Sequence, residues 1–172
     1  RFRFGLDLGV EGKGIDFSMF WQGVAKRDLW LDGLMFWGIS GGEWQSTGLK
    51  EHLDYYRPEN TTSVFGPNTN AYFPKMYMSK DMNQKVQTRY LQNGAYARLK
   101  NIQLGYTFPT QIINKLHMQK LRVYVSAENV LTITSLPSGF DPETTYSSYS
   151  DGNSGKTYPL QTTISFGLHA TF

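Results

Sequence analysis

The sequence is notable first for what it lacks. Its 172 residues include no cysteine, which excludes a disulfide framework and any thiolate metal ligand or nucleophile. No apolar run approaches the roughly 20 residues that a membrane-spanning helix needs. Lys and Arg do not cluster, and the formal net charge of +3 is too small to indicate binding to nucleic acid.

Aromatic residues are abundant, by contrast, and they are mixed with polar ones. They make up 15% of the sequence, yet the mean hydropathy is −0.43. Large apolar side chains are therefore interleaved with polar residues rather than gathered in blocks. A β-strand with one apolar and one polar face requires this kind of interleaving.

Period-2 alternation is clearest at the two ends of the chain. From Leu160 to Phe172 nearly every second residue is apolar, and the residues between them are mostly polar. Residues 1–11 and 15–25 alternate in the same way and are separated by Gly12-Lys13-Gly14. These patterns predict a terminal strand and an opening β-hairpin.

Alternation over the whole chain predicts an all-β, antiparallel sheet. We expect strands near residues 1–11, 15–25, 96–108, 120–134 and 159–172, with long loops at 26–95 and 135–158. After the third strand, Pro109 should end the strand and Thr110 should cap one helical turn holding Ile112, Ile113 and Leu116. Short connections that alternate with long loops are typical of outer-membrane barrels.

A soluble β-sandwich is the alternative to a transmembrane barrel. Charged residues lie well inside the polar faces of the predicted strands, among them Arg3, Asp7 and Asp16, and aromatic residues such as Phe108 and Phe172 end the apolar faces. A polar lumen and an apolar band with aromatic girdles account for both features, so the sequence favours the barrel.

Five strands are too few to close a barrel, since single-chain bacterial barrels use roughly eight or more. The chain opens in strand rhythm, without an initiating Met or a signal peptide. We therefore expect up-and-down transmembrane strands that form the C-terminal part, residues 1–172, of a larger barrel domain. Assembly of several copies into one barrel is a weaker alternative.

Three segments carry a family resemblance. Tyr96 to Pro109 reads YARLKNIQLGYTFP, Leu121 to Thr132 reads LRVYVSAENVLT, and Gly139 to Glu143 reads GFDPE. These segments and the closing strand at Phe172 resemble the end of SusC/RagA-type TonB-dependent transporters. The similarity is strong over residues 96–172 and moderate over 1–24, and Glu128 departs from the Gln that the family more often carries before the Asn.

The resemblance implies the last five strands of a barrel of about 22 strands in a Bacteroidetes outer membrane. It also implies a plug domain that this chain lacks, contact with TonB through the missing N-terminal portion, and a SusD-like surface lipoprotein as partner. The cargo would be an oligosaccharide or oligopeptide taken up without covalent chemistry. The C-terminus would be periplasmic, and the Asp141, Pro142 and Glu143 loop motif and Phe172 would be family signatures.

No catalytic, cofactor or metal site emerges from the residues themselves. His52, His117 and His169 are scattered over loop, turn and strand. Asp141, Glu143, Asp151 and Asn153 share one loop and offer oxygen ligands for Ca²⁺, but they lack EF-hand spacing. Solvated acidic loop residues are the favoured interpretation, and we expect the protein not to be an enzyme.

The aromatic residues of loop 26–95 are the best candidates for contacts with cargo or a partner protein, since aromatic side chains often anchor interfaces. Packing of the loop's own small core is the plainer interpretation. A second class of function, a self-contained extracellular β-module that binds glycans through this loop, stays open. The candidate contact residues are Trp30, Trp37, Trp44, Tyr55, Tyr56 and Tyr72.

Overall fold

The computed structural model describes residues 2–38, 48–75, 77, 83–114, 117–145 and 155–172. The chain divides into two compact units. The first, here called the sheet unit, comprises Arg1–Arg27, Asn93–Ser135 and Leu160–Phe172. The second, the loop unit, comprises Asp28–Gln92 and Leu136–Pro159. Within the described residues, no helix is long and apolar enough to cross a membrane.

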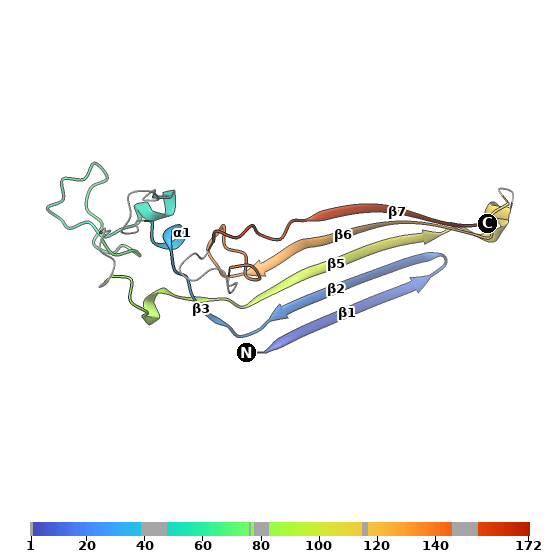
Figure 1. Ribbon diagram of the computed structural model, residues 1–172, viewed down its shortest axis with the longest axis horizontal. Coiled ribbons are helices and arrows are strands. Elements are labelled where there is room, and N and C mark those ends of the chain that lie inside the picture. The colour runs from blue at the N-terminus through green and yellow to red at the C-terminus, as the bar shows by residue number, and fades with distance from the viewer. Residues whose placement is uncertain (1, 39–47, 76, 78–82, 115–116, 146–154) are drawn as a thin grey trace. The chain divides into compact units, whose positions relative to one another are not determined.

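The sheet unit is one antiparallel sheet of five long strands in the order β1-β2-β5-β6-β7 (Figure 1). β1 and β7 therefore form its two edges. Every neighbouring pair is antiparallel, as the alternation predicted. The strands are β1 Arg3–Gly12, β2 Ile15–Val24, β5 Tyr96–Thr107, β6 Lys120–Thr134 and β7 Thr163–Thr171.

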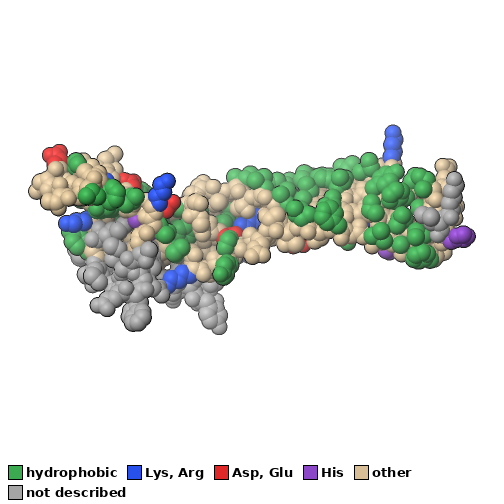
Figure 2. Space-filling model, turned by 90° about the horizontal axis from the view of Figure 1, so that it is seen from above, with side chains coloured by type: hydrophobic (Ala, Val, Ile, Leu, Met, Phe, Trp, Pro, Cys, Tyr) green, Lys and Arg blue, Asp and Glu red, His purple; other side chains and the backbone are tan. Residues whose placement is uncertain are grey.

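The register aligns apolar side chains into rows that cross all five strands, because residues directly opposite one another share a face. One such row is Val10, Phe17, Leu104, Val125 and Phe166. The adjacent row on the other face is Glu11, Asp16, Gly105, Tyr124 and Gly167. Figure 2 shows hydrophobic side chains gathered in a band along the sheet. The sheet thus has one apolar and one polar face.

A two-residue turn joins β1 to β2. Lys13 and Gly14 both have positive φ, 52° and 81°. Positive φ at both central residues defines a type I′ turn, whose twist matches that of the flanking strands. The Gly14 carbonyl also accepts a hydrogen bond from the Thr107 amide at 2.7 Å, so the turn is fixed to the end of β5.

Two predicted boundaries in the sheet unit need correction. α2 covers Thr110–Ile113 with Pro109 at its N-cap and no side-chain cap bond, so Thr110 begins the helix rather than capping it. β7 begins at Thr163, not at 159, and its pairing with β6 ends at Glu128. The next residue, Asn129, has φ 53°, which turns the backbone away from the ladder. Its side chain and carbonyl bond instead to Gln161 and Thr162.

A β-bulge in β5 changes which face Arg98 occupies. Asn101 lies opposite Phe20 and Leu99 lies opposite Trp21, so Lys100 is an extra residue relative to β2. The bulge moves Arg98 from the face of Ile102 and Leu104, where strict alternation puts it, to the polar face. There Arg98 donates a hydrogen bond from Nε to the Thr132 hydroxyl at 2.7 Å.

The loop unit is built from short elements around an aromatic core. β3 (Asp28–Trp30) pairs with β4 (Leu91–Asn93) in a separate two-stranded sheet. The helical turns are α1 (Leu34–Trp37), η2 (Lys50–Leu53) and η3 (Thr88–Tyr90). Isolated bridges join Tyr55 to Phe73 and Arg57 to Asn68. The segment predicted as loop 26–95 therefore contains structure of its own.

Candidate functional site

Aromatic rings form the core of the loop unit. The buried members are Leu31, Phe36, Trp37, Phe73 and Tyr90, and Trp30, Tyr55, Tyr72 and Phe140 pack against them. Most ring pairs meet edge to face, for example Trp37 and Tyr90 with centroids 4.9 Å apart. This geometry places the positive ring edge against the negative ring face and is the favoured one for aromatic pairs.

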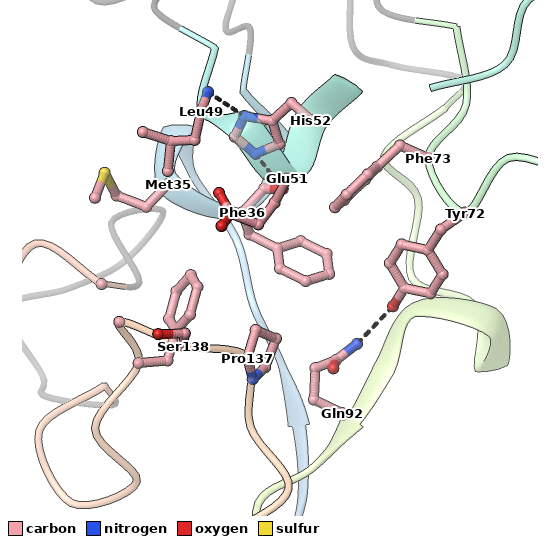
Figure 3. Close-up of a pocket in the computed structure, with 13 residues that line it drawn as sticks. Met35, Phe36, Leu49, Glu51, His52, Tyr72, Phe73, Gln92, Pro137 and Ser138 are labelled. Carbon is pink, nitrogen blue, oxygen red and sulfur yellow. Dashed lines mark hydrogen bonds between the residues drawn. The ribbon is translucent and has the colours of Figure 1, made fainter. Parts of the chain in front are cut away.

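A cavity of about 440 Å³ lies against this core and is the candidate site (Figure 3). Four aromatic rings, those of Phe36, Tyr72, Phe73 and Phe140, contribute to its wall. Its volume is within the range of small-ligand sites, roughly 300–1,000 Å³. The rest of the lining comes from Met35, Leu49, Glu51, His52, Gln92, Pro137, Ser138, Gly139 and Gly155.

His52 is a structural member of this wall. Its Nδ1 accepts a hydrogen bond from the Leu49 amide at 2.8 Å, so the facing Nε2 carries the proton and donates to the Phe36 carbonyl at 3.0 Å. The side chain is buried, and Gly38 lies against its ring. Both ring nitrogens are occupied, which leaves His52 no polar atom to offer a ligand.

Two other polar side chains of the wall, those of Gln92 and Glu51, differ in whether they already have hydrogen-bond partners. The Gln92 amide donates to both the Tyr72 hydroxyl and the Tyr90 carbonyl, at 3.0 and 2.8 Å. Glu51 lies in η2 with an exposed side chain, and Figure 3 shows its carboxylate directed into the cavity. Among the described lining residues, Glu51 is the one charged side chain.

The structure distributes the predicted contact residues over different environments. Trp37 is 3% exposed and its indole donates to the Leu31 carbonyl, so its side chain packs the core. Trp30 and Tyr55 are half-buried against that core. Tyr56 is 41% exposed, and Tyr72 lines the cavity. Trp44 lies outside the described residues, and ligand or partner contact by the others stays a prediction.

The Asp141, Pro142 and Glu143 motif forms a tight turn. Asp141 Oδ1 accepts hydrogen bonds from the backbone amides of Glu143 and Thr144, at 2.8 and 3.3 Å. Pro142 is fully buried. The Asp141 carboxylate therefore stabilises the turn locally. Asp151 and Asn153 lie outside the described residues, and no group of three or more potential metal ligands occurs among the residues that are described.

Sequence reasoning singled out Tyr72 but missed most of the cavity. Glu51, Leu49 and Gln92 carry no pattern that marks a site, and Pro137 to Phe140 come from a different loop of the chain. The sequence indicates only that His52 lies in a loop and does not reveal that it is buried. One signal for its role was present in the sequence. His52 follows Leu49 by three residues, a spacing at which a side chain can accept a hydrogen bond from a backbone amide.

No family model matches the chain. TonB-dependent receptor P3 of Formosa agariphila is 27% identical over 178 aligned positions, which cover 99% of this chain and 16% of that relative. TonB-dependent receptor P26 of the same organism is 25% identical and covers 98% of this chain and 17% of its own length. The chain thus spans about one sixth of the curated relatives it matches.

Solved structures agree on the fold. The RagAB peptide importer in its closed-closed state matches with a TM-score of 0.65 and 24% identity, over 99% of this chain and 17% of that one. Its open-open state matches with a TM-score of 0.64 and 22% identity, over the same shares of both chains. These relatives are receptors and transporters by name, not enzymes. Sequence relatives and fold together show the resemblance that the motifs indicated: the chain is similar to a portion of the SusC/RagA-type TonB-dependent transporters.

Proposed function

We propose that this chain supplies the C-terminal strands of an outer-membrane β-barrel that imports oligosaccharides or oligopeptides, acting with TonB and a SusD-like lipoprotein. The observation that carries the proposal is the five-stranded sheet with one apolar and one polar face. Lipid on one side and a water-filled lumen on the other require this division.

Exposure of the apolar face supports a lipid contact. Phe166 is 84% exposed, and Val10, Ile164 and Leu168 are also largely exposed. Soluble monomers rarely expose contiguous apolar patches above a few hundred Å². The exposed Phe, Val, Ile and Leu side chains form one continuous surface over five strands rather than isolated surface positions. Such a surface fits the hydrocarbon region of a bilayer.

The two sheet edges support a larger barrel. β1 and β7 each have one neighbour in the sheet, so each presents an outer row of backbone groups for pairing. In lipid such groups must be paired, because each unsatisfied one costs several kcal/mol. We infer that strands preceding β1 complete a barrel of about 22 strands. The plug and its contact with TonB would belong to that preceding portion.

The connections support an orientation. The β1–β2 turn at Lys13 and Gly14 and the α2-containing connection between β5 and β6 are the short ones. Outer-membrane barrels have short periplasmic turns and longer extracellular loops. We therefore place Phe172 on the periplasmic side and assign the loop unit to the extracellular side, where it would meet the cargo and the lipoprotein.

Fractionation of cells that carry the natural gene tests the proposal. The protein should sediment with the outer membrane, require detergent for extraction and co-purify with a surface lipoprotein. The other candidate, a self-contained glycan-binding module, predicts a protein that is monodisperse in plain buffer and binds oligosaccharides without detergent. That result would contradict the proposed import function and favour the glycan-binding module.

A further inference from the structure

The cavity of the loop unit combines features that specify one kind of ligand. We propose that it binds a basic side chain, lysine or arginine, of a peptide. The inference rests on the proposed function, because it names the cargo class among those left open there.

The aromatic rings form walls on several sides of the cavity. Phe36 and Phe73 are inclined at 70°, Phe36 and Phe140 at 74°, and Tyr72 and Phe73 at 86°. These rings pack edge to face against one another, so the wall combines parts of several rings and offers no single broad, free face on which a flat sugar ring could stack. A cation placed over an accessible ring face in this wall would be attracted by the negative charge of that face.

Two of the polar side chains in the wall have no hydrogen-bond donor left for a sugar. Both ring nitrogens of His52 and both amide hydrogens of Gln92 already have partners. A sugar would bury several hydroxyl groups, and each one left unpaired costs affinity. The aliphatic stem of Lys or Arg has no such requirement and packs well against Met35, Leu49 and the rings.

Charge complementarity indicates that the end of the bound side chain is positively charged. The Glu51 carboxylate is directed into the cavity, and no Lys or Arg lines it among the described residues. No ion pair of Glu51 with another described residue is present. An ammonium or guanidinium group could therefore meet a carboxylate and aromatic faces together, and charge-assisted hydrogen bonds are roughly twice as strong as neutral ones.

The volume sets the scale of the ligand. At about 440 Å³ the cavity lies near the lower end of the range for small-molecule sites. It accommodates one long side chain with part of its backbone and excludes a folded partner domain. The site would thus recognise one side chain of an extended peptide, and the other side chains would contact different surfaces.

Calorimetry with matched peptides tests the inference. The natural full-length protein, purified from the cell fraction that contains it, is titrated with N-acetylated, C-amidated Ala-Lys-Ala. The same tripeptide with norleucine at the centre keeps the stem and lacks the charge, and maltotriose serves as the sugar probe. We expect the lysine peptide to bind at least about tenfold more tightly than the norleucine peptide.

Glu51→Gln should abolish this preference, while Glu59→Gln, which removes an exposed acid outside the cavity lining, should keep it. Phe140→Leu should also weaken lysine binding without the loss of a charge, and Phe65→Leu is its matched control. Near-UV circular dichroism establishes that each variant is folded. If Glu51→Gln fails to fold, Phe140→Leu against Phe65→Leu decides.

Equal affinity for lysine and norleucine peptides would overturn the inference, as would equal effects of the two Glu variants. Binding of maltotriose in competition with the peptide would also overturn it. The proposed function is judged separately by membrane fractionation. An outer-membrane protein without lysine preference would contradict the cavity assignment alone, and lysine preference in a protein outside the membrane would contradict the importer alone.

Discussion

Asp16 in β2 and Arg122 in β6 form an ion pair that crosses the intervening strand β5. Arg122 Nη2 and Nε lie 2.5 and 3.0 Å from the two carboxylate oxygens. The residue of β5 beneath the pair is Gly105, which lies opposite Asp16. The Arg122 guanidinium also lies 4.8 Å from the centroid of the Tyr124 ring. The polar face of the sheet is thus connected across three strands by side chains.

Replacement of Gly105 by Ala should break this connection. A Cβ there would lie 2.5 Å from both Asp16 carboxylate oxygens and 2.6 Å from Arg122 Nη2, so the pair must move apart. We expect the two side chains to separate and the free energy of unfolding to fall, because the ion pair is lost. Urea unfolding in detergent micelles measures it. Gly12→Ala is the matched control, because a Cβ at Gly12 meets nothing within 4 Å, and equal effects of the two variants would contradict the argument.

The apolar and polar faces of β7 should report different surroundings. The sequence contains no cysteine, so one introduced thiol per variant can carry a bimane label. Phe166→Cys lies on the apolar face, and Ser165→Cys, opposite Ser126, lies on the polar face. In the assembled protein we expect brominated lipid to quench the label at 166 and not at 165. Equal quenching at both positions would be inconsistent with a lipid-facing row.

The strands were predictable because alternation is a local property of the sequence. Each face of β1, β2, β6 and β7 can be assigned by counting every second residue. The exception is β5, where Leu99 and Ile102 share a face although they are three positions apart. That break in the period is the trace of the bulge at Lys100, and it moves Arg98 to the polar face.

The cavity was not predictable, for a different reason. Its wall brings together Met35, His52, Tyr72, Phe73 and Phe140, which are far apart in the sequence. Aromatic content alone indicated a core or a contact surface. It did not indicate which aromatic residues would pack in the core and which would lie at the surface. Burial decides that question residue by residue, and burial depends on the three-dimensional packing of the loop unit.

Trp37 and Tyr56 should separate packing from surface contact. Trp37→Ala removes a ring in edge-to-face contact with Phe36 and Tyr90, and we expect it to destabilise the loop unit by about 3–5 kcal/mol. Tyr56 is exposed, so Tyr56→Ala should leave the fold intact. Thermal unfolding followed by near-UV circular dichroism measures both. Similar melting temperatures for the two variants would mean that the core does not depend on Trp37.

His52 should stabilise the loop unit through its two backbone hydrogen bonds. His52→Leu leaves the Leu49 amide and the Phe36 carbonyl without this partner. The loss should cost about 1–3 kcal/mol at the buried Phe36 carbonyl and less at the part-buried Leu49 amide. His52→Gln offers both an acceptor and a donor and should recover part of the loss. Gly38→Ala should resemble His52→Leu, because Gly38 has φ 81° and a Cβ there would lie 2.8 Å from His52 Nδ1. Hydrogen exchange at the Leu49 amide gives the readout: it should be fast in His52→Leu and Gly38→Ala and slower in His52→Gln, and uniform exchange across all three variants would contradict this role for His52.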